Sequence, residues 1–426
     1  MKAPFNFNAR LTVGVCLVLV TGFTAPGMGA EPWSRFRGPG GQGRHDGPLP
    51  VKWSASENVV WKIELPGPGG SSPIVFGDRI FLTSYSGYAV PGLTGGDLTA
   101  LQRHVVCVQR ADGKTLWKKD VPAAQPEQAK ARDHGYASST PLADADRLYV
   151  FMGRSGVFAY NHDGKELWRA DVGSGLHGWD SAASPVLHKD LLIINASVES
   201  GALIALNKTT GKEVWRAAGM KESWNTPILV PVAGGKEELV VAIFGKVLGL
   251  DPATGEKLWS CATDIGWYMV PSLVHDKDVI YCIGGRTGGG LAVRAGGRGD
   301  VTASHRLWTL KKGSNVSSPV LHEGHLYILH ENLGMAICVE AATGKLVYEE
   351  RIPGASQFYA STLLADGKLY GVARRGGVFV VAAKPQFEFL GRNELGDRSS
   401  FDASPAADGG RLLIRSDKFL YAIGPK

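Results

Sequence analysis

The stretch SAASPVLHKDLLIINASVESGALIALNKTTGKEVWR (residues 181–216) contains one complete copy of the unit that decides the fold of this chain. Small residues and Pro185 precede an apolar segment, and the stretch closes with a Thr-Gly turn and Trp215. Proline is tolerated at the start of a strand, where its missing N–H costs the sheet least. The Thr-Gly pair supplies the residue of positive φ that a hairpin needs. The unit therefore predicts four short strands joined by tight turns.

This unit recurs along the chain. Its opening slot is occupied in turn by Pro73, Pro141, Pro185, Pro227, Pro271, Pro319, Thr362 and Pro405. From Pro141 onward the spacings between these positions are 44, 42, 44, 48, 43 and 43 residues. A period near 43 residues with four strands per repeat is typical of a β-propeller blade. The 56 glycines and the lack of long helical patterns agree with many short strands.

The two ends of the repeat array complement each other. Seven units have a full set of strands, whereas the eighth, residues 401–426, lacks its outer strand and its tryptophan. The segment NVVWKIEL (residues 58–65) is a strand with Trp61 but without a unit of its own. Placed beside the eighth unit, it closes the ring and removes exposed strand edges. We predict an all-β, eight-bladed β-propeller of four-stranded blades over residues 58–426, preceded by a lead-in segment at 31–57.

The first thirty residues differ from the rest. Lys2 and Arg10 give a positive start, residues 11–23 form a short apolar core, and small residues lead to Ala30. A membrane anchor needs roughly 20 apolar residues, and this core is shorter. We predict a signal peptide at 1–30, and hence an exported protein of the periplasm or cell envelope with no integral membrane segment after its removal.

Charge and cysteines exclude several classes of protein. The 46 Lys and Arg residues, against 40 Asp and Glu, are scattered, so nucleic acid is not an expected partner. Cys107, Cys261, Cys282 and Cys338 form no C-x-x-C pair, which argues against a metal knuckle or a redox motif. Cys107, Cys282 and Cys338 lie in apolar runs and are expected to be buried. An exported protein also permits a disulfide among the four.

The phrase TGKEVW, with Ala-x-Asn or Leu-Asp a few residues ahead, resembles the tryptophan-docking repeat of quinoproteins. That repeat is known from eight-bladed pyrroloquinoline quinone (PQQ) dehydrogenases and from non-enzymatic propellers such as the BamB lipoprotein. The segments WSRFRGPGGQG (residues 33–43) and FYASTLLADGKLY (residues 358–370) resemble a group of exported PQQ-like proteins from planctomycete-type bacteria. The resemblance covers residues 31–426. It implies docking on a neighbouring blade for Trp61, Trp117, Trp168, Trp215, Trp259 and Trp308.

A catalytic site is not expected. A PQQ dehydrogenase needs carboxylate and amide ligands for calcium, cations for the cofactor's carboxylates, a stacking aromatic ring and a catalytic aspartate. This chain has no adjacent cysteines, such as the alcohol-oxidising members carry, and no evident calcium cluster. It also lacks a G-x-S-x-G elbow and an H-E-x-x-H motif. We predict no catalytic, cofactor-binding or metal-binding residues, with PQQ and calcium as the alternative.

A row of aromatic and polar residues precedes the inner strands. Loops that enter inner strands lie on one face of a propeller, around its central funnel. The candidate binding face consists of Tyr136, Trp179, Asp180, Trp224, Asn225, Trp267, Tyr268, Asn315, Phe358, Tyr359, Phe401 and Asp402. These side chains either bind a ligand or pack between the blades. Trp179, Trp224 and Trp267 are the ones we expect to be exposed.

The predicted function follows from this face. We expect a monomeric, non-catalytic propeller that binds a protein or another component of the cell envelope through its loops. Insertions at residues 86–103 and 121–135 lengthen the first blade, an insertion at 286–305 lengthens the fifth, and these long loops are expected contact surfaces. The alternatives are a quinoprotein-type oxidoreductase and a carbohydrate-binding propeller that uses the aromatic rings as stacking platforms.

Residues 38–43 match G-x-G-x-x-G, the fingerprint of dinucleotide-binding enzymes. That fingerprint has to leave a strand and enter a helix, but Gly47, Pro48 and Pro50 follow and forbid one. We expect these glycines to belong to a lead-in that crosses the surface of the ring, not to a nucleotide site.

Overall fold

The structure is a computed structural model that describes residues 1–4, 32–92, 96–131, 134–286 and 288–425. The chain divides into two units, residues 1–31 and residues 32–426. All but four residues of the predicted signal peptide lie outside the described residues. Among the described residues no helix has the length and apolar character needed to cross a membrane.

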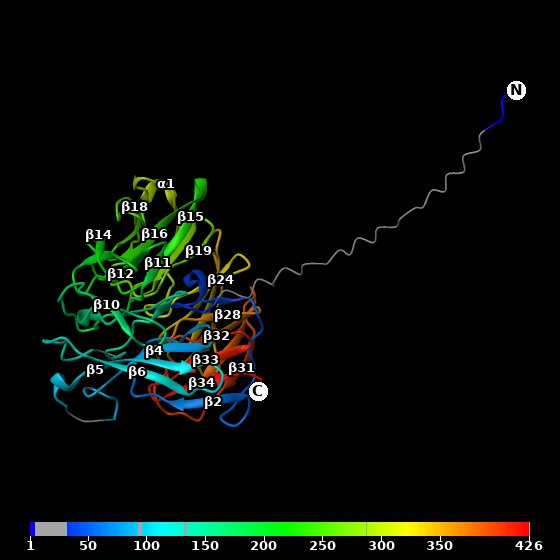
Figure 1. The fold of residues 1–426 in the computed structure, drawn as a ribbon. Coiled ribbons are helices and arrows are strands. Elements are labelled where there is room, and N and C mark those ends of the chain that lie inside the picture. The colour runs from blue at the N-terminus through cyan, green and yellow to red at the C-terminus, as the bar shows by residue number, and fades with distance from the viewer. Residues whose placement is uncertain (5–31, 93–95, 132–133, 287, 426) are drawn as a thin grey trace. The chain divides into compact units, whose positions relative to one another are not determined.

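The second unit consists of β-sheets that follow one another around a ring (Figure 1), and the described residues form eight of them. Each sheet contains one propeller blade of four antiparallel strands, and two of the sheets have a fifth, short strand that pairs in parallel. From the inner to the outer strand, blade 1 has β3 (Ile74–Phe76), β4 (Arg79–Ser86), β5 (Gln102–Gln109) and β6 (Thr115–Pro122); blade 2 has β7 (Leu142–Ala143), β8 (Leu148–Phe151), β9 (Val157–Tyr160) and β10 (Glu166–Ala170); blade 3 has β11 (Val186–His188), β12 (Leu191–Ala196), β13 (Ala202–Asn207) and β14 (Glu213–Ala218); and blade 4 has β15 (Ile228–Val232), β16 (Lys236–Ile243), β17 (Lys246–Leu250) and β18 (Lys257–Ala262). Blade 5 has β19 (Val274–Asp276), β20 (Val279–Gly284), β21 (Gly289–Arg294) and β23 (Arg306–Leu310); blade 6 has β24 (Val320–His322), β25 (His325–Leu329), β26 (Met335–Glu340) and β27 (Leu346–Arg351); blade 7 has β28 (Leu363–Ala365), β29 (Lys368–Val372), β30 (Val378–Ala382) and β31 (Phe389–Asn393); and blade 8 has β32 (Ala406–Asp408), β33 (Arg411–Arg415), β34 (Phe419–Ile423) and β2 (Val59–Glu64).

Helical segments among the described residues are short. They are the 3-10 turns η1 (Pro39–Gly41), η2 (Leu98–Ala100), η3 (Gly153–Ser155) and η4 (Ala233–Gly235) and the single turn α1 (Thr302–His305). The all-β, eight-bladed prediction is confirmed.

The predicted closure of the ring is also confirmed. Strand β2 pairs with β34 in antiparallel register, with Lys62 opposite Tyr421 and Glu64 opposite Phe419. Blade 8 therefore takes its outermost strand from the beginning of the propeller and its three other strands from the end.

Hydrophobic side chains fill the space between neighbouring blades. In one such core, Ile193 and Leu203 of blade 3 pack with Val241 and Leu248 of blade 4. The strands between the inner and outer ones are apolar on both faces for this reason, because a blade is covered by a neighbour on each side. Cys107, Cys261, Cys282 and Cys338 are buried free thiols within these cores.

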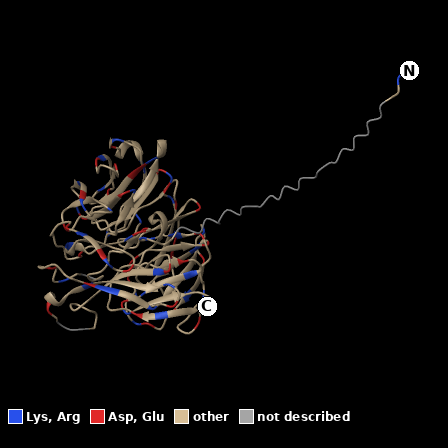
Figure 2. Ribbon diagram, in the orientation of Figure 1, with Lys and Arg blue, Asp and Glu red and all other residues tan. Residues whose placement is uncertain are grey.

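Charged residues lie mainly on the turns and outer strands. Lys and Arg are interspersed with Asp and Glu over the blades in the view of Figure 2, as the scattered charges of the sequence predict.

Five tryptophans of the outer strands dock on the following blade. Each indole Nε1 donates to a backbone carbonyl oxygen: Trp61 to Arg110 (3.3 Å), Trp117 to His162 (2.9 Å), Trp168 to Lys208 (3.0 Å), Trp215 to Pro252 (3.2 Å) and Trp308 to Ala341 (2.9 Å). The accepting turn contains the glycine of the repeat. At Gly211, φ is 71° and a Cβ would lie 2.6 Å from the ring of Trp168. One glycine thus provides both the turn and the docking surface.

Trp259 departs from this expectation. Its Nε1 donates to Glu238 of its own blade at 2.7 Å, and its ring covers Gly249. The reason is the insertion in blade 5, which replaces the Thr-Gly turn. A short strand, β22 (Gly299–Asp300), pairs in parallel with β18 beside Trp259, and Arg298 forms an ion pair with Glu238 at 3.2 Å.

The lead-in segment lies in the centre of the ring, and does not cross its surface as we expected. Its backbone and side chains accept hydrogen bonds from inner strands of four blades: Trp33 from Val75 (2.8 Å), Ser34 from Ala143 (2.8 Å), Gly43 from Leu364 (2.8 Å) and Gln42 from His275 (3.1 Å). Strand β1 (Arg44–His45) then pairs in parallel with β28. The physical reason is that the inner strands have free edges, which the lead-in satisfies.

The glycines of residues 38–43 make this path possible. Gly38 has φ 66° and lies against the ring of Trp33, whereas Gly43 has φ 68° and lies against the guanidinium of Arg37. Arg37 is buried and donates to the carbonyl oxygens of Gly41 and Pro319. The glycines wrap the chain around a buried cation inside the ring, and η1 is too short to be the helix of a dinucleotide site.

Candidate binding funnel

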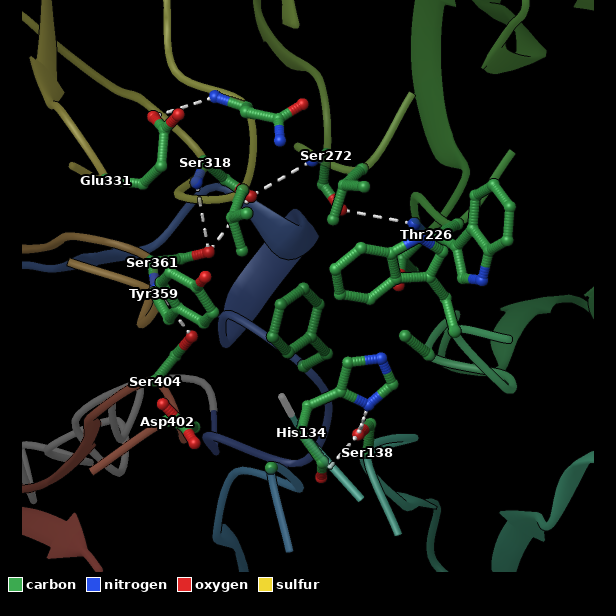
Figure 3. Close-up of a pocket in the computed structure, with 18 of the residues that line it drawn as sticks. His134, Ser138, Thr226, Ser272, Ser318, Glu331, Tyr359, Ser361, Asp402 and Ser404 are labelled. Carbon is green, nitrogen blue, oxygen red and sulfur yellow. Dashed lines mark hydrogen bonds between the residues drawn. The ribbon is translucent and has the colours of Figure 1, made fainter. Parts of the chain in front are cut away.

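A cavity of about 160 Å³ opens at the centre of the ring, on the face that carries the loops before the inner strands. We call this the funnel face. Six residues of the predicted binding face line the cavity, one from each of blades 3 to 8: Trp179, Trp224, Tyr268, Asn315, Tyr359 and Asp402. His134 and Ser138 of blade 2, both labelled in Figure 3, also line the cavity, as does Phe36 of the lead-in. The lead-in, blue in Figure 3, passes behind the cavity.

A belt of hydroxyl groups forms the inner wall. Each belt residue precedes or follows the opening slot of its unit, and its backbone N–H donates to the hydroxyl oxygen of the next blade. The bonds run from Ser72 to Thr140 (2.9 Å), Thr140 to Ser184 (3.0 Å), Ser184 to Thr226 (2.9 Å), Thr226 to Ser272 (3.1 Å), Ser272 to Ser318 (3.0 Å), Ser318 to Ser361 (3.2 Å) and Ser361 to Ser404 (2.9 Å). Figure 3 shows the part from Thr226 to Ser404. The belt explains why Ser or Thr accompanies the proline in the repeat.

Tyr268 is the centre of the aromatic wall. Its ring centroid lies 6.0 Å from that of Trp179 and 5.7 Å from that of Trp224, in tilted and edge-on arrangements that aromatic rings favour. Trp224 is held by a hydrogen bond from Nε1 to the carbonyl oxygen of Asp180 at 2.7 Å. The rings support one another, so this wall is formed before any ligand binds.

Glu331 supplies a carboxylate to the opposite wall. It lies in the turn between β25 and β26 and is 2% exposed. Its oxygens accept hydrogen bonds from Ser314 Oγ (2.8 Å), the Asn315 backbone N–H (2.9 Å) and Asn332 Nδ2 (3.2 Å). Asn315 also donates through Nδ2 to the hydroxyl of Tyr268 at 3.4 Å, which links the carboxylate to the aromatic wall.

Sequence reasoning missed Glu331, although a signal for it existed. In an antiparallel blade the turn between the second and third strands lies on the same face as the loop that enters the first strand. Glu199, Glu331 and Arg374 lie in such turns, and so do Asp97, Arg154, Arg286, Arg375, Asp417 and Lys418. The topology alone would have placed Glu331 in this wider set of charged residues at the funnel face.

Asp402 and Tyr359 hold an internal cation. Arg374 donates through Nε to Asp402 Oδ1 at 2.8 Å, and its guanidinium lies 4.2 Å over the centroid of the Tyr359 ring. The pair anchors the loops of blades 7 and 8 at the mouth of the cavity.

Three aromatic residues of the predicted face belong to the cores instead. Tyr136, Phe358 and Phe401 are buried, at 2%, 0% and 5% exposure, and pack between blades. Phe358 precedes Tyr359 in an extended segment, and adjacent residues there point to opposite sides. One side chain of such a pair faces the funnel and the other faces the core.

Two polar residues of the predicted face are also buried structural groups. Asn225 donates through Nδ2 to the Ala242 carbonyl oxygen at 2.6 Å. Asp180 forms an ion pair with Arg103 at 3.2 Å, and Arg103 pairs with Glu127 at 2.8 Å. These contacts tie the extended blade 1 to blades 2 and 3.

Glu199 lies beside this cluster and accepts a hydrogen bond from the Ser181 hydroxyl. Burial raises the pKa of Glu199 to about 8, from an ordinary value of 4.5. The same effect raises the pKa of Asp180, against the opposing influence of Arg103.

Of the three tryptophans that we expected to be exposed, Trp224 is buried at 6% exposure because its indole bonds to Asp180 and packs on Tyr268, and Trp179 is half-buried. Trp267 is exposed, as we expected, but does not line the cavity. It is 37% exposed, its ring lies 5.2 Å from that of Tyr268, and the guanidinium of Arg286 lies 5.8 Å from it. Leu176, Phe244 and Leu333 are similarly exposed on loops and turns of the same face. An arc of exposed apolar residues thus borders the cavity over blades 3 to 6.

The lining does not suit PQQ and calcium. In the part of the chain that the structure describes, no three His, Cys, Asp or Glu side chains are placed to hold a metal ion. PQQ carries carboxylates that need cations, but the described residues of the lining include Glu331 and Asp402 and neither Lys nor Arg. The charge of the lining therefore opposes this cofactor. The absence of a cofactor stays a prediction.

Eight four-stranded blades, closed by a strand from the beginning of the propeller and joined by docked tryptophans, define a PQQ-like β-propeller. The family profile described as outer membrane protein assembly factor BamB matches residues 86–218 and 196–386. The chain belongs to this family.

Individual relatives agree with the family. The chain is 22% identical over 386 residues to outer membrane protein assembly factor BamB of Burkholderia pseudomallei, covering 86% of this chain and 88% of that one. It is 27% identical over 279 residues to quinohemoprotein alcohol dehydrogenase of Comamonas testosteroni, covering 59% of this chain and 38% of the enzyme. The crystal structure of BamB from Moraxella catarrhalis superposes on this chain with a TM-score of 0.61 at 14% identity, and the match covers 86% of this chain and 97% of that one.

Proposed function

We propose that this protein is a non-catalytic scaffold of the cell envelope that binds a partner protein through its funnel face. The sequence of residues 1–30 supports export, and the name of the Burkholderia relative ties that protein to outer membrane protein assembly. A comparable role in holding components of an envelope complex together fits a rigid ring with one loop-bearing face.

The arc of exposed apolar residues around the funnel carries this proposal. Phe244, Trp267 and Leu333 are 50%, 37% and 50% exposed and lie on turns of one face. Exposed apolar residues that surround a preformed pocket are typical of protein interfaces, in which a few aromatic anchors supply most of the binding energy.

A pair of matched variants tests the proposal. The funnel-face variant combines Phe244→Ser, Trp267→Ser and Leu333→Ser. The outer-strand variant combines Leu116→Ser, Leu167→Ser and Leu307→Ser, three residues that are 40–44% exposed on β6, β10 and β23. Both remove a similar exposed apolar area.

The measurement is chemical crosslinking of each purified protein to envelope extract, followed by identification of the crosslinked proteins. We expect the funnel-face variant to lose its specific partner by at least tenfold, with the outer-strand variant unchanged. Retention of that partner by the funnel-face variant, at an unchanged melting temperature, would refute the proposal.

The similarity to quinohemoprotein alcohol dehydrogenase supports a second candidate, a quinoprotein-type oxidoreductase. Titration calorimetry with PQQ and calcium chloride tests it directly. Micromolar binding together with dye-linked dehydrogenase activity would establish the enzyme and overturn the scaffold.

A further inference from the structure

Arg374, at the mouth of the cavity, shows how the funnel face holds a cation. Arg374 lies over the Tyr359 ring and pairs with the carboxylate of Asp402. An aromatic face and a carboxylate together are a favourable environment for a guanidinium or an ammonium group.

A second aromatic and carboxylate pair lies across the cavity, between Tyr268 and Glu331. The groups that donate to Glu331 are neutral: a serine hydroxyl, a backbone N–H and an asparagine amide. His330 Nδ1 lies 3.5 Å from the carboxylate, but it accepts the Asn332 backbone N–H at 3.2 Å and so does not donate to Glu331. Among the described residues no Lys or Arg pairs with this carboxylate.

A buried carboxylate without a basic partner is costly to keep ionised. Glu331 is 2% exposed, and among the described residues that line the cavity there is no Lys or Arg. Asn315, which bridges Glu331 and Tyr268, also has a buried Oδ1 that accepts no hydrogen bond from any described residue. A ligand that brings a positive charge and N–H donors would satisfy both groups at once.

The size of the cavity limits the ligand. Sites for drug-sized molecules and cofactors measure about 300–1,000 Å³, whereas a cavity of about 150 Å³ holds one benzene ring. The funnel cavity, at about 160 Å³, suits the end of a single side chain. Its open mouth lies within the apolar arc of the funnel face, where a partner protein would sit.

We propose that the funnel binds one lysine or arginine side chain of the partner, with its charged group between the Tyr268 and Trp179 rings and the Glu331 carboxylate. This inference rests on the proposed function, since the side chain arrives with a protein docked on the funnel face. The ring wall provides cation–π attraction and the carboxylate provides the ion pair.

The test uses three capped tripeptides, acetyl-Gly-Xaa-Gly-amide, in which Xaa is Arg, Lys or Gln. The protein is labelled with 5-fluorotryptophan, and the Trp179 fluorine resonance is assigned with Trp179→Phe. We expect the Arg and Lys peptides to shift this resonance and to bind at least about tenfold more tightly than the Gln peptide. Equal affinities for the three peptides, or no shift with any of them, would overturn the proposal.

Two charge variants in the same blade sharpen the test. Glu331→Gln keeps the shape and hydrogen-bond acceptor but removes the charge, and it should weaken Arg-peptide binding by about tenfold. Glu350→Gln removes an exposed charge on β27 and should change the affinity by less than twofold. If Glu331→Gln lowers the melting temperature or alters the fluorine spectrum, Tyr268→Leu replaces it and should weaken the Arg peptide several-fold.

The two proposals can fail separately. Loss of the partner in the funnel-face variant, combined with no preference for the basic peptides, would retain the scaffold and refute the cation site. An unchanged affinity in both Glu331→Gln and Tyr268→Leu would refute it as well.

Discussion

Glu199 offers a quantitative test of how the structure responds to pH. Its side chain is buried at the turn between β12 and β13, and one of its oxygens, Oε2, has no hydrogen-bond partner among the described residues. Burial raises the pKa of Glu199 from 4.5 to about 8, so the folded protein holds a proton there at neutral pH. The unfolded chain releases that proton above its ordinary pKa.

The sign and size of the effect follow from this difference. Between pH 4.5 and about 8 the folded state binds one proton more than the unfolded state. The stabilisation from the neutral carboxyl is therefore complete below pH 4.5 and is lost as the pH rises toward 8. The free energy of unfolding falls by about 1.4 kcal/mol per pH unit for one proton, which amounts to a few kcal/mol between pH 5 and pH 8.

Glu199→Gln isolates this contribution, because glutamine has the shape of the protonated acid and does not titrate. We expect the variant and the wild type to differ by about 1 kcal/mol or less at pH 5. At pH 8 the variant should be more stable by a few kcal/mol. Urea unfolding followed by tryptophan fluorescence at pH 5, 6, 7 and 8 gives the two curves, and Glu350→Gln serves as the exposed control. A difference that stays constant with pH would show that Glu199 is ionised in the folded protein and would refute the reasoning.

Three further predictions use matched residues. Gly211→Ala should destabilise the protein by about 2 kcal/mol or more, because its Cβ would meet the docked indole of Trp168. Gly219→Ala should cost only about 1 kcal/mol, because Gly219 also has a positive φ but a Cβ there would have nothing within 4 Å. The midpoints of urea unfolding distinguish the two variants. Ser184→Ala breaks the hydroxyl belt and leaves the buried backbone N–H of Thr140 unpaired, which should cost about 1–3 kcal/mol of stability. The control Ser200→Ala, at an exposed position, should change the stability by no more than about 0.5 kcal/mol in the same assay. Burial raises the pKa of the Cys107 thiol to about 12, so Ellman's reagent at pH 8 should modify none of the four buried cysteines until the protein unfolds; rapid reaction of the folded protein would contradict the cores described above.

The blade count and the closure could be predicted because the repeat records them directly in the sequence. Each opening slot and each tryptophan belongs to one blade, and Trp61 had no blade of its own. Trp259 could not be placed in the same way. Its docking turn is replaced by an insertion, and the contact between Glu238 and Arg298 depends on two segments about 60 residues apart.

The site was predicted in part, for a geometric reason. Tyr359 and Tyr268 line the funnel, whereas their neighbours Phe358 and Trp267 point into a core and into solvent. The backbone path of each loop decides whether an aromatic side chain faces the funnel, a core or solvent. The position of the residue before the proline of the repeat does not predict that path. Glu331 lies outside the pattern, because the repeat phrase marks the loops that enter blades and not the turns within them.

The shared eighth blade has a consequence for the life of the protein in the cell. Strand β2 is synthesised near the start of the propeller and its partner β34 near the end, with more than three hundred residues between them. A newly synthesised chain thus remains an open arc, with unpaired edges at both ends, until its last strand has been made. The ring therefore closes only when β34 is present to pair with β2. A chain that ends before residue 419 keeps exposed strand edges, which favour aggregation and binding by chaperones and proteases.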